Sequence, residues 1–475
     1  MERIGELIGQ LRNEHSVPAV QVGIFRGKET VFLGGAGFGN LEKQEKADEN
    51  TTFAIGSQTK SFVAAALALL VDEGKLQWDK PVRDYIPEFA MQDGYLTETL
   101  TVRDILSHRS GLPRHEFMLQ LNLDAFSAEE YVHKLRYLKT SAPVRSRMQY
   151  SNLMYLVAGH LLERVSGERW GEFIGNRLLE PLGMGRTNFS VAENSAVANS
   201  AQPYRLAGGS PVPMPWEVIN AASPAGAMNS CVTDMLKYLR FHLDMGRIGD
   251  RAVVSEAAMR ECHSPQIVIA ENPPIFRGEM QFRGYGLGWF TECYRGHWVI
   301  HHGGGIDGFI AEMGIIPELD AGFIICSNLD GNFVPAILQF SILDELLGLS
   351  PVDWNQRFAE MKTMGQGMFA QHVGRFEKNP SDEAKSLPLG RYAGAYRSEA
   401  YGKIAVAETP DGLVFRARKL EAPLRHVSGN GFLMLDQDKM LAVPMQFVLD
   451  VQGRVTGVDA DFEPAIGAMI GYDRE

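Results

Sequence analysis

The sequence predicts an α+β protein, in the form of an α/β sandwich, joined to a C-terminal all-β barrel. Strand-like runs near the N-terminus and again between residues 285 and 328 enclose a long, mainly helical region. Strands at both ends of a region with helices inserted between them imply a sheet assembled from distant segments, not regular βαβ alternation. Beyond residue 388, short strands with frequent turn signals are typical of a small barrel or sandwich.

The chain length of 475 residues exceeds what one hydrophobic core organises, so at least two domains are expected. We place the first domain at residues 1–350, with a helical subdomain at about 77–280. A helix and linker follow at 351–388, because FEKNPSDEAKSLP (376–388) is polar and contains proline. The barrel domain is expected at 389–475.

The individual elements follow from hydrophobic pattern and turn residues. AVQVGIF and ETVFLGG (19–25 and 29–35) flank a short glycine-containing turn and predict a hairpin. Residues 57–76 are helical in pattern, with Gly74 as the stop. Later strands are expected at 287–293, 297–302, 308–317 and 322–328, and a helix at 332–348.

Composition and charge exclude several classes of protein. The formal net charge is −12 and there is no basic block to follow a phosphate backbone, so a nucleic-acid partner is not expected. Four scattered cysteines do not make a disulfide framework. The longest apolar helical run, residues 62–71, is about half of the ~20 residues that span a bilayer. With no signal-peptide pattern seen, we expect a cytoplasmic protein without a membrane partner.

Ser57-Gln58-Thr59-Lys60 stands where a strand-like segment runs into the apolar helix. Three residues along a helix return to nearly the same face, so the hydroxyl of Ser57 and the amine of Lys60 are expected to be neighbours. The Ser57 N–H, at a helix start, is available to hold an oxyanion. The alternative is a helix-capping serine beside a surface lysine, and the motif alone does not decide between them.

Two further blocks add weight to this motif: Tyr150-Ser151-Asn152, opening a helix, and His302-Gly303-Gly304-Gly305, ending an apolar strand. Together the three blocks resemble the serine β-lactamase and penicillin-binding-protein superfamily, with motifs S-x-x-K, Y-x-N and [K/H]-x-G. The class C-like branch, peptidase family S12, is the most similar. The resemblance covers about residues 5–347 and implies a β-lactamase/transpeptidase-like antiparallel sheet flanked by helices. A weaker resemblance links GRYAGAY onward to lipocalin-like C-terminal domains.

By position, the resemblance implies that Ser57 is the nucleophile and that Lys60 and Tyr150 handle its proton. It implies Asn152 as a contact of substrate and of Lys60, and His302 as the third-motif residue. The oxyanion donors are then the N–H groups of Ser57 and Gly305, while Gly304 and its neighbours let a ligand approach the strand backbone. The reaction is acyl transfer through an acyl-enzyme. No metal or cofactor is expected.

The identity of the base stays open at this point. Lysine and tyrosine titrate near ~10.4 and ~10, so either pKa must fall to near 7 for that residue to act as a base. Packed together, Lys60 and Tyr150 share one proton and titrate as a unit, so a single base is not assigned.

The third motif carries His302 where many β-lactamases have a lysine, a fixed cation suited to a substrate carboxylate. This favours peptidase, amidase or esterase chemistry on a small-molecule or peptide substrate. The alternatives are a β-lactamase, or a non-catalytic ligand-binding or scaffold protein. Self-association into a homo-oligomer is left open.

Three competing signals have simpler explanations. Gly303, Gly305 and Gly308 satisfy G-x-G-x-x-G, but a strand follows where a dinucleotide site needs a helix. His301 and His302 are adjacent in a strand and therefore point to opposite faces, which argues against a shared metal. Ser110 has no activating neighbour in sequence and is expected to be a turn residue.

Overall fold

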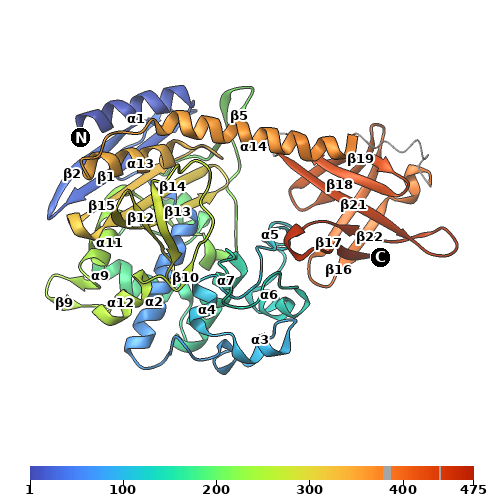
Figure 1. Cartoon of the computed structure of the whole chain (residues 1–475), viewed down its shortest axis with the longest axis horizontal. Helices are drawn as coiled ribbons and strands as arrows, with labels where there is room; N and C mark the ends of the chain where they lie inside the picture. The colour runs from blue at the N-terminus through green and yellow to red at the C-terminus, as the bar shows by residue number, and fades with distance from the viewer. Residues whose placement is uncertain (378–386, 438–439) are drawn as a thin grey trace.

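A central antiparallel sheet brings the two ends of the first domain together (Figure 1). The structure, a computed structural model, describes residues 1–377, 387–437 and 440–475. The sheet has the order β10-β11-β12-β13-β14-β15-β1-β2-β3. These strands are β10 (Ile267–Val268), β11 (Met280–Tyr285), β12 (Phe290–Tyr294), β13 (His297–Ile306), β14 (Phe309–Ile316), β15 (Ala321–Ser327), β1 (Ala19–Arg26), β2 (Glu29–Asn40) and β3 (Glu45–Lys46).

Strand β1 packs against a hydrophobic core on each face of the sheet. Val20, Val22 and Ile24 point into one core, together with the apolar residues of α1 (Glu2–Glu14) and α13 (Val334–Leu346). On the opposite face, Gly23 leaves room for Leu236 of α11 (Val232–Leu243), since a Cβ there would lie 3.0 Å from that side chain. Helix α2 (Thr59–Asp72), with twelve buried residues, belongs to the core on this second face. Strand pairing between β1 and β15 confirms the sheet assembled from distant segments.

The middle of the chain is mainly helical, as predicted, but its boundary with the sheet lies earlier than residue 280. Strand β10 already pairs with β11 within that range. Two residues are too few to give a periodic signal, so the pattern missed this edge strand. The helices are α3 (Gly94–Thr99), α4 (Val102–Leu106), α5 (Glu116–Gln120), α6 (Ala128–Lys134), α7 (Asn152–Ser166), α8 (Trp170–Ile174), α9 (Glu180–Leu182), α10 (Val191–Ala196) and α12 (Glu256–His263). Short ribbons are formed by β4 (Phe53–Ala54) with β7 (Asn229–Ser230), β5 (Tyr204–Ala207) with β6 (Ser210–Pro213), and β8 (Arg247–Ile248) with β9 (Arg251–Ala252).

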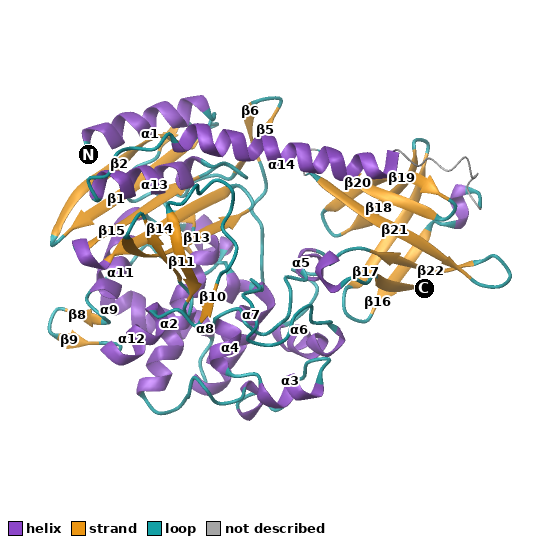
Figure 2. Cartoon of the chain, viewed as in Figure 1, coloured by secondary structure: helices purple, strands orange, loops and turns teal. Residues whose placement is uncertain are grey.

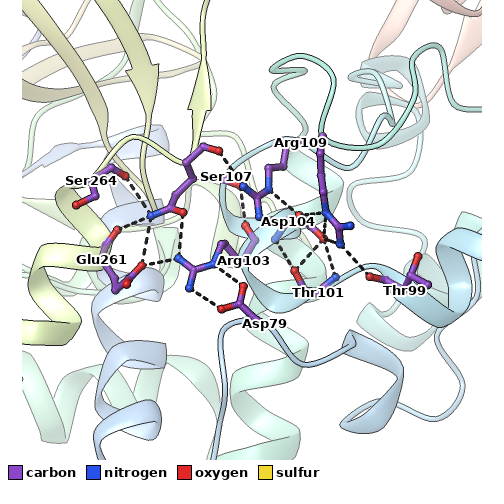
Figure 3. Close-up of polar contacts among 11 residues, drawn as sticks. Asp79, Thr99, Thr101, Arg103, Asp104, Ser107, Arg109, Glu261 and Ser264 are labelled. Atoms are coloured by element: carbon purple, nitrogen blue, oxygen red, sulfur yellow. Dashed lines mark hydrogen bonds and ion pairs between the residues drawn. The ribbon is translucent and has the colours of Figure 1, made fainter.

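A buried carboxylate fixes the segment around α4 (Figure 3). Asp104 caps its own helix through Thr101 and accepts hydrogen bonds from Arg109 and Arg145. Burial acts to raise the pKa of Asp104, but hydrogen bonds from Arg145, Thr101 and Arg109 outweigh it and keep the pKa below its usual value. Arg103, on the same helix, binds Asp79 and Glu261. Through Arg109 the network ties the loop that carries His108 to helix α4.

The C-terminal strands form a closed barrel, as predicted (Figure 2). Its interior is filled by aromatic side chains such as Tyr396, Phe415, Phe432 and Phe447. Helix α14 (Trp354–Glu377) leads from the sheet toward it, and most of the linker predicted at 376–388 lies outside the described residues. The strands are β16 (Gly394–Ser398), β17 (Gly402–Thr409), β18 (Gly412–Ala417), β19 (Leu420–Ser428), β20 (Gly431–Asp436), β21 (Leu441–Leu449), β22 (Val455–Ala460) and β23 (Ile470–Arg474).

The barrel packs against the helical region of the first domain. Phe117 of α5 stacks on Phe462 at a centroid distance of 4.5 Å, and the Lys134 amine donates to the carbonyl oxygen of Glu399.

Among the described residues, no helix combines the length and apolar character needed to cross a membrane.

Candidate active site

Ser57 lies in a single tight turn, η1 (Gly56–Gln58), between strand β4 and helix α2. Gly56 takes a left-handed conformation, with φ of +51°, and a Cβ there would lie 2.7 Å from the nitrogen of Gly305. Only glycine meets both demands without strain. The turn therefore presses Ser57 against the end of β13.

Lys60, one turn along α2, is fully buried and points back at Ser57. Its Nζ lies 2.9 Å from the Oγ of Ser57 and 2.6 Å from the carbonyl oxygen of Ala225 in η5 (Ser223–Ala225). Burial lowers the pKa of Lys60 well below its ordinary value, with Glu116 acting against this and Arg114 adding to it. The hydroxyl and the amine are therefore neighbours, as predicted, and burial favours the neutral form of the amine.

Tyr150 completes a compact group with these two residues. The Nζ of Lys60 lies 4.9 Å from the centroid of its ring. Burial raises the pKa of the Tyr150 phenol, and a hydrogen bond with Ser57 opposes that rise. The phenol is therefore protonated at neutral pH, while the neighbouring amine is biased toward its neutral form.

His108 supports Tyr150 from behind, a role that its sequence context did not reveal. Its ring packs on that of Tyr150 at 4.2 Å, and its Nδ1 accepts the backbone N–H of Ser151 at 3.1 Å. Burial lowers the pKa of His108 well below its ordinary value, so the imidazole is neutral and can accept this bond. His108 is thus a fully buried histidine that lies beside the Tyr150 motif.

Asn152 opens α7 as predicted, but its side chain differs from the expectation of a Lys60 contact. Its Nδ2 lies 3.5 and 3.4 Å from the two carboxylate oxygens of Glu116 on α5. Within the described residues, its Oδ1 has no hydrogen-bond partner. The carboxylate is the stronger acceptor and turns the amide toward α5. The segment RHEF, which supplies Glu116, carries no motif that would have predicted this.

The two adjacent histidines of β13 point to opposite faces, as expected for a strand. His302 faces the site, with its ring 6.3 Å from that of Tyr150, whereas His301 contacts Glu292. The Nδ1 of His302 donates to the Gly303 carbonyl oxygen at 2.6 Å, so its Nε2 accepts from the hydroxyl of Tyr285 at 3.0 Å. Burial lowers the pKa of His302 to about 3, and the nearby charge of Lys60 is the second-largest contribution to this fall. His302 is a neutral hydrogen-bonding group and not a cation.

Tyr285 was missed as a member of the site. It ends β11, and its ring meets that of Tyr150 edge-on at 6.4 Å. Its segment, YGLGW, matches none of the three motifs, so the pattern did not predict its place in the site.

Gly304 and Gly305 bring β13 into contact with the Ser57 turn. A Cβ on Gly304 would lie 1.9 Å from the carbonyl oxygen of Ile55 and 3.2 Å from the nitrogen of Ser57. The strand backbone therefore runs beside the Ser57 N–H at van der Waals distance. The nitrogen of Gly305 lies beside the same turn, since a Cβ on Gly56 would lie 2.7 Å from it.

We expect Gly304→Ala to destabilise the fold by about 1–3 kcal/mol, because the added methyl group must displace backbone and not a flexible side chain. Gly34→Ala in β2 is the matched control, since a Cβ there meets nothing within 4 Å. Urea unfolding of both variants measures the difference. Equal stability of the two would contradict the close approach of β13 to the Ser57 turn.

A pocket of about 160 Å³ opens beside Ser57. Its walls come from α5, the start of α7, the loop before η5 and the end of β13. Its lining includes three acidic side chains, Glu116, Glu217 and Asp307, as well as Asn152 and Gly305.

No three histidine, cysteine, aspartate or glutamate side chains of the described ranges form a group suited to a metal ion.

Comparison with known proteins identifies the family. Residues 4–345 match the profile of the Beta-lactamase family, and residues 378–469 match a domain of unknown function, DUF3471. The chain belongs to the Beta-lactamase family. It is 30% identical to the unguisins hydrolase ungD' of Aspergillus campestris, over 97% of this chain and 89% of that protein. This confirms the resemblance drawn from the three motifs and identifies a β-lactamase-like serine hydrolase at the level of the family.

Solved structures of this superfamily share the fold. The octameric penicillin-binding protein homologue from Pyrococcus abyssi aligns with a TM-score of 0.66 and 22% identity, covering 99% of both chains. The D-amino acid amidase from Ochrobactrum anthropi SV3 aligns with a TM-score of 0.59 and 23% identity, covering 73% of this chain and 98% of the amidase. Both likenesses confirm the β-lactamase-like architecture, and the first extends over the C-terminal barrel.

Proposed function

We propose that this β-lactamase-like chain hydrolyses a peptide, amide or ester through an acyl-enzyme on Ser57. One observation carries the proposal: the Oγ of Ser57 lies 2.9 Å from the amine of Lys60, and burial lowers the pKa of that amine. A neutral amine at this distance accepts the hydroxyl proton as the oxygen attacks a carbonyl carbon. A surface lysine beside a capping serine would keep its charge and could not accept this proton.

The remaining groups have roles that follow from their protonation states. In the proposed first step, Ser57 Oγ bonds to the substrate carbonyl carbon while its proton passes to Lys60. The N–H groups of Ser57 and Gly305 hold the tetrahedral oxygen, and each such donor contributes about 3 kcal/mol where measured in other enzymes. The protonated Tyr150 gives its proton to the leaving group and is reprotonated from Lys60. Water then attacks the acyl-enzyme by the same route in reverse.

The substrate class follows from the third motif. Because His302 is neutral, it offers no fixed cation for the carboxylate that β-lactams carry. This supports an amide, peptide or ester substrate of the D-aminopeptidase, DD-peptidase or esterase kind over a β-lactam. The names of similar proteins, an unguisins hydrolase and a D-amino acid amidase, support amide or peptide cleavage.

The test is a substrate panel with the purified protein: D- and L-amino-acid amides, p-nitrophenyl esters and nitrocefin. We expect turnover of amides or esters that exceeds nitrocefin hydrolysis at least 100-fold in kcat/KM. Faster hydrolysis of nitrocefin than of any amide or ester would instead assign a β-lactamase. No turnover of any member would favour a ligand-binding or scaffold protein.

A further inference from the structure

Arg418 stands at the tip of the β18–β19 hairpin, yet its side chain is only 10% exposed. Its backbone has a φ of +50°, a conformation that turns of this kind usually assign to glycine or asparagine. The ion-pair partners of this side chain lie outside the barrel. Backbone strain of this kind persists where contacts of the residue with the surrounding structure compensate it, often at functional sites.

The side chain of Arg418 leaves the barrel and binds two carboxylates of the first domain. Its Nη2 contacts Glu217, and its Nε lies 3.1 Å from an oxygen of Asp124. The neighbouring Lys419 adds an ion pair with Glu217 at 3.2 Å. By contrast, Arg416, two residues earlier, is half exposed and pairs with Glu421, a residue of the same barrel.

Glu217 lies in the wall of the pocket that contains Ser57, and it is only 8% exposed. Asp307 lies in the same wall, and burial, followed by the charge of Glu217, raises its pKa. Two carboxylates this close repel each other unless a cation compensates them. Arg418 and Lys419 supply that cation from the barrel, and removing it would leave Glu217 buried and unpaired, which is the costly outcome.

Asp124 ends the segment 116–124, whose Glu116, Leu119 and Leu123 form a second wall of the pocket. The barrel also grips the start of this segment. The backbone N–H of His115 donates to Glu463 at 2.6 Å, and its Nδ1 lies 2.6 Å from the hydroxyl of Tyr401. The two walls of the pocket are thus tied to one rigid barrel.

We propose that Arg418 is a positioning residue through which the barrel completes the substrate pocket of the hydrolase domain. It fixes Glu217 and the segment 116–124 at the spacing that receives the part of a substrate beyond the scissile bond. Its effect on catalysis rests on the function proposed above, whereas its effect on the two walls does not. A substrate with a small acyl group reaches Ser57 without using these walls and is insensitive to Arg418.

The test is a double-mutant cycle of Arg418→Gln and Glu217→Gln, with Arg416→Gln as the matched control on the same hairpin. For the amino-acid amide that the wild type cleaves fastest, we expect Arg418→Gln to raise KM at least tenfold with kcat within threefold. Adding Glu217→Gln to Arg418→Gln should restore KM to within threefold of Glu217→Gln alone, since no buried charge is then left unpaired. Arg418→Lys should rescue part of the loss. Turnover of p-nitrophenyl acetate should stay within threefold throughout.

Hydrogen–deuterium exchange of the same variants separates this inference from the proposed function. We expect faster exchange in residues 113–124 and 214–220 of Arg418→Gln and no change in Arg416→Gln, whether or not any substrate is cleaved. Exchange and KM that are the same in Arg418→Gln and Arg416→Gln would overturn the inference. So would losses from Arg418→Gln and Glu217→Gln that simply add. If the variants exchange as expected but the wild type cleaves no substrate, the result would count against the proposed hydrolase function alone.

Discussion

Ser57→Ala is expected to lower kcat for every cleaved substrate by about 10⁵–10⁶-fold, the loss seen when the nucleophile of a serine hydrolase is removed. The hydroxyl forms the covalent bond in the proposed mechanism, so no neighbouring group replaces it. The turn that holds Ser57 depends on Gly56, and the N-cap residues of η1 and α2 are Ile55 and Gln58, not Ser57. The variant should therefore fold as the wild type does, and steady-state kinetics measures the loss.

Ser110→Ala is the matched control for this variant. Ser110 is also buried, and its hydroxyl accepts the backbone N–H of Leu112 in a turn. We expect this replacement to leave kcat within threefold of the wild type. Activity of Ser57→Ala above a tenth of the wild type would exclude Ser57 as the nucleophile.

Lys60→Met is expected to abolish turnover, by at least about 10³-fold, and at the same time to raise the melting temperature. The activity is lost because no amine remains to take the Ser57 proton. Stability is gained because a fully buried amine is replaced by an apolar side chain of similar length, which removes a desolvation cost. Thermal unfolding at pH 7 with parallel kinetics measures both changes.

The pH dependence of this stability difference has a definite sign. The folded-state pKa of Lys60 is lowered, while in the unfolded chain it titrates near ~10.4. Between those two values the unfolded state binds the extra proton, so the stability of the wild type rises with pH relative to Lys60→Met. The gap in favour of Lys60→Met therefore shrinks as the pH rises from 7 toward 10. A variant that is less stable than the wild type at pH 7, with a gap independent of pH, would contradict a neutral buried lysine.

The parts of the site that could be predicted from sequence are those set by local geometry. Ser57 and Lys60 are three residues apart on one helix, so periodicity alone brings hydroxyl and amine together. Strand alternation predicted that His301 and His302 face opposite sides, and the family resemblance implied that His302 is the third-motif residue. The strands around residues 19–35 and 287–328 carried clear apolar patterns, and the family resemblance supplied the antiparallel arrangement of the sheet.

What could not be predicted depends on contacts between distant segments. The Asn152 amide turns toward Glu116 because α5 lies over it, and nothing in RHEF indicates where that helix packs. Tyr285 reaches His302 because β11 lies two strands from β13 in the sheet, with β12 between them. Arg418 meets Glu217 across 201 residues of chain. No periodicity encodes such a contact.

The central claim is that burial of Lys60 beside Ser57 makes this one hydroxyl a nucleophile. Labelling with a fluorophosphonate, followed by peptide mass mapping, tests it most directly in wild type, Ser57→Ala and Lys60→Met. The account predicts one adduct per chain on Ser57 in the wild type and none in either variant. An adduct on another residue, or labelling of Ser57 at the wild-type rate in Lys60→Met, would contradict it.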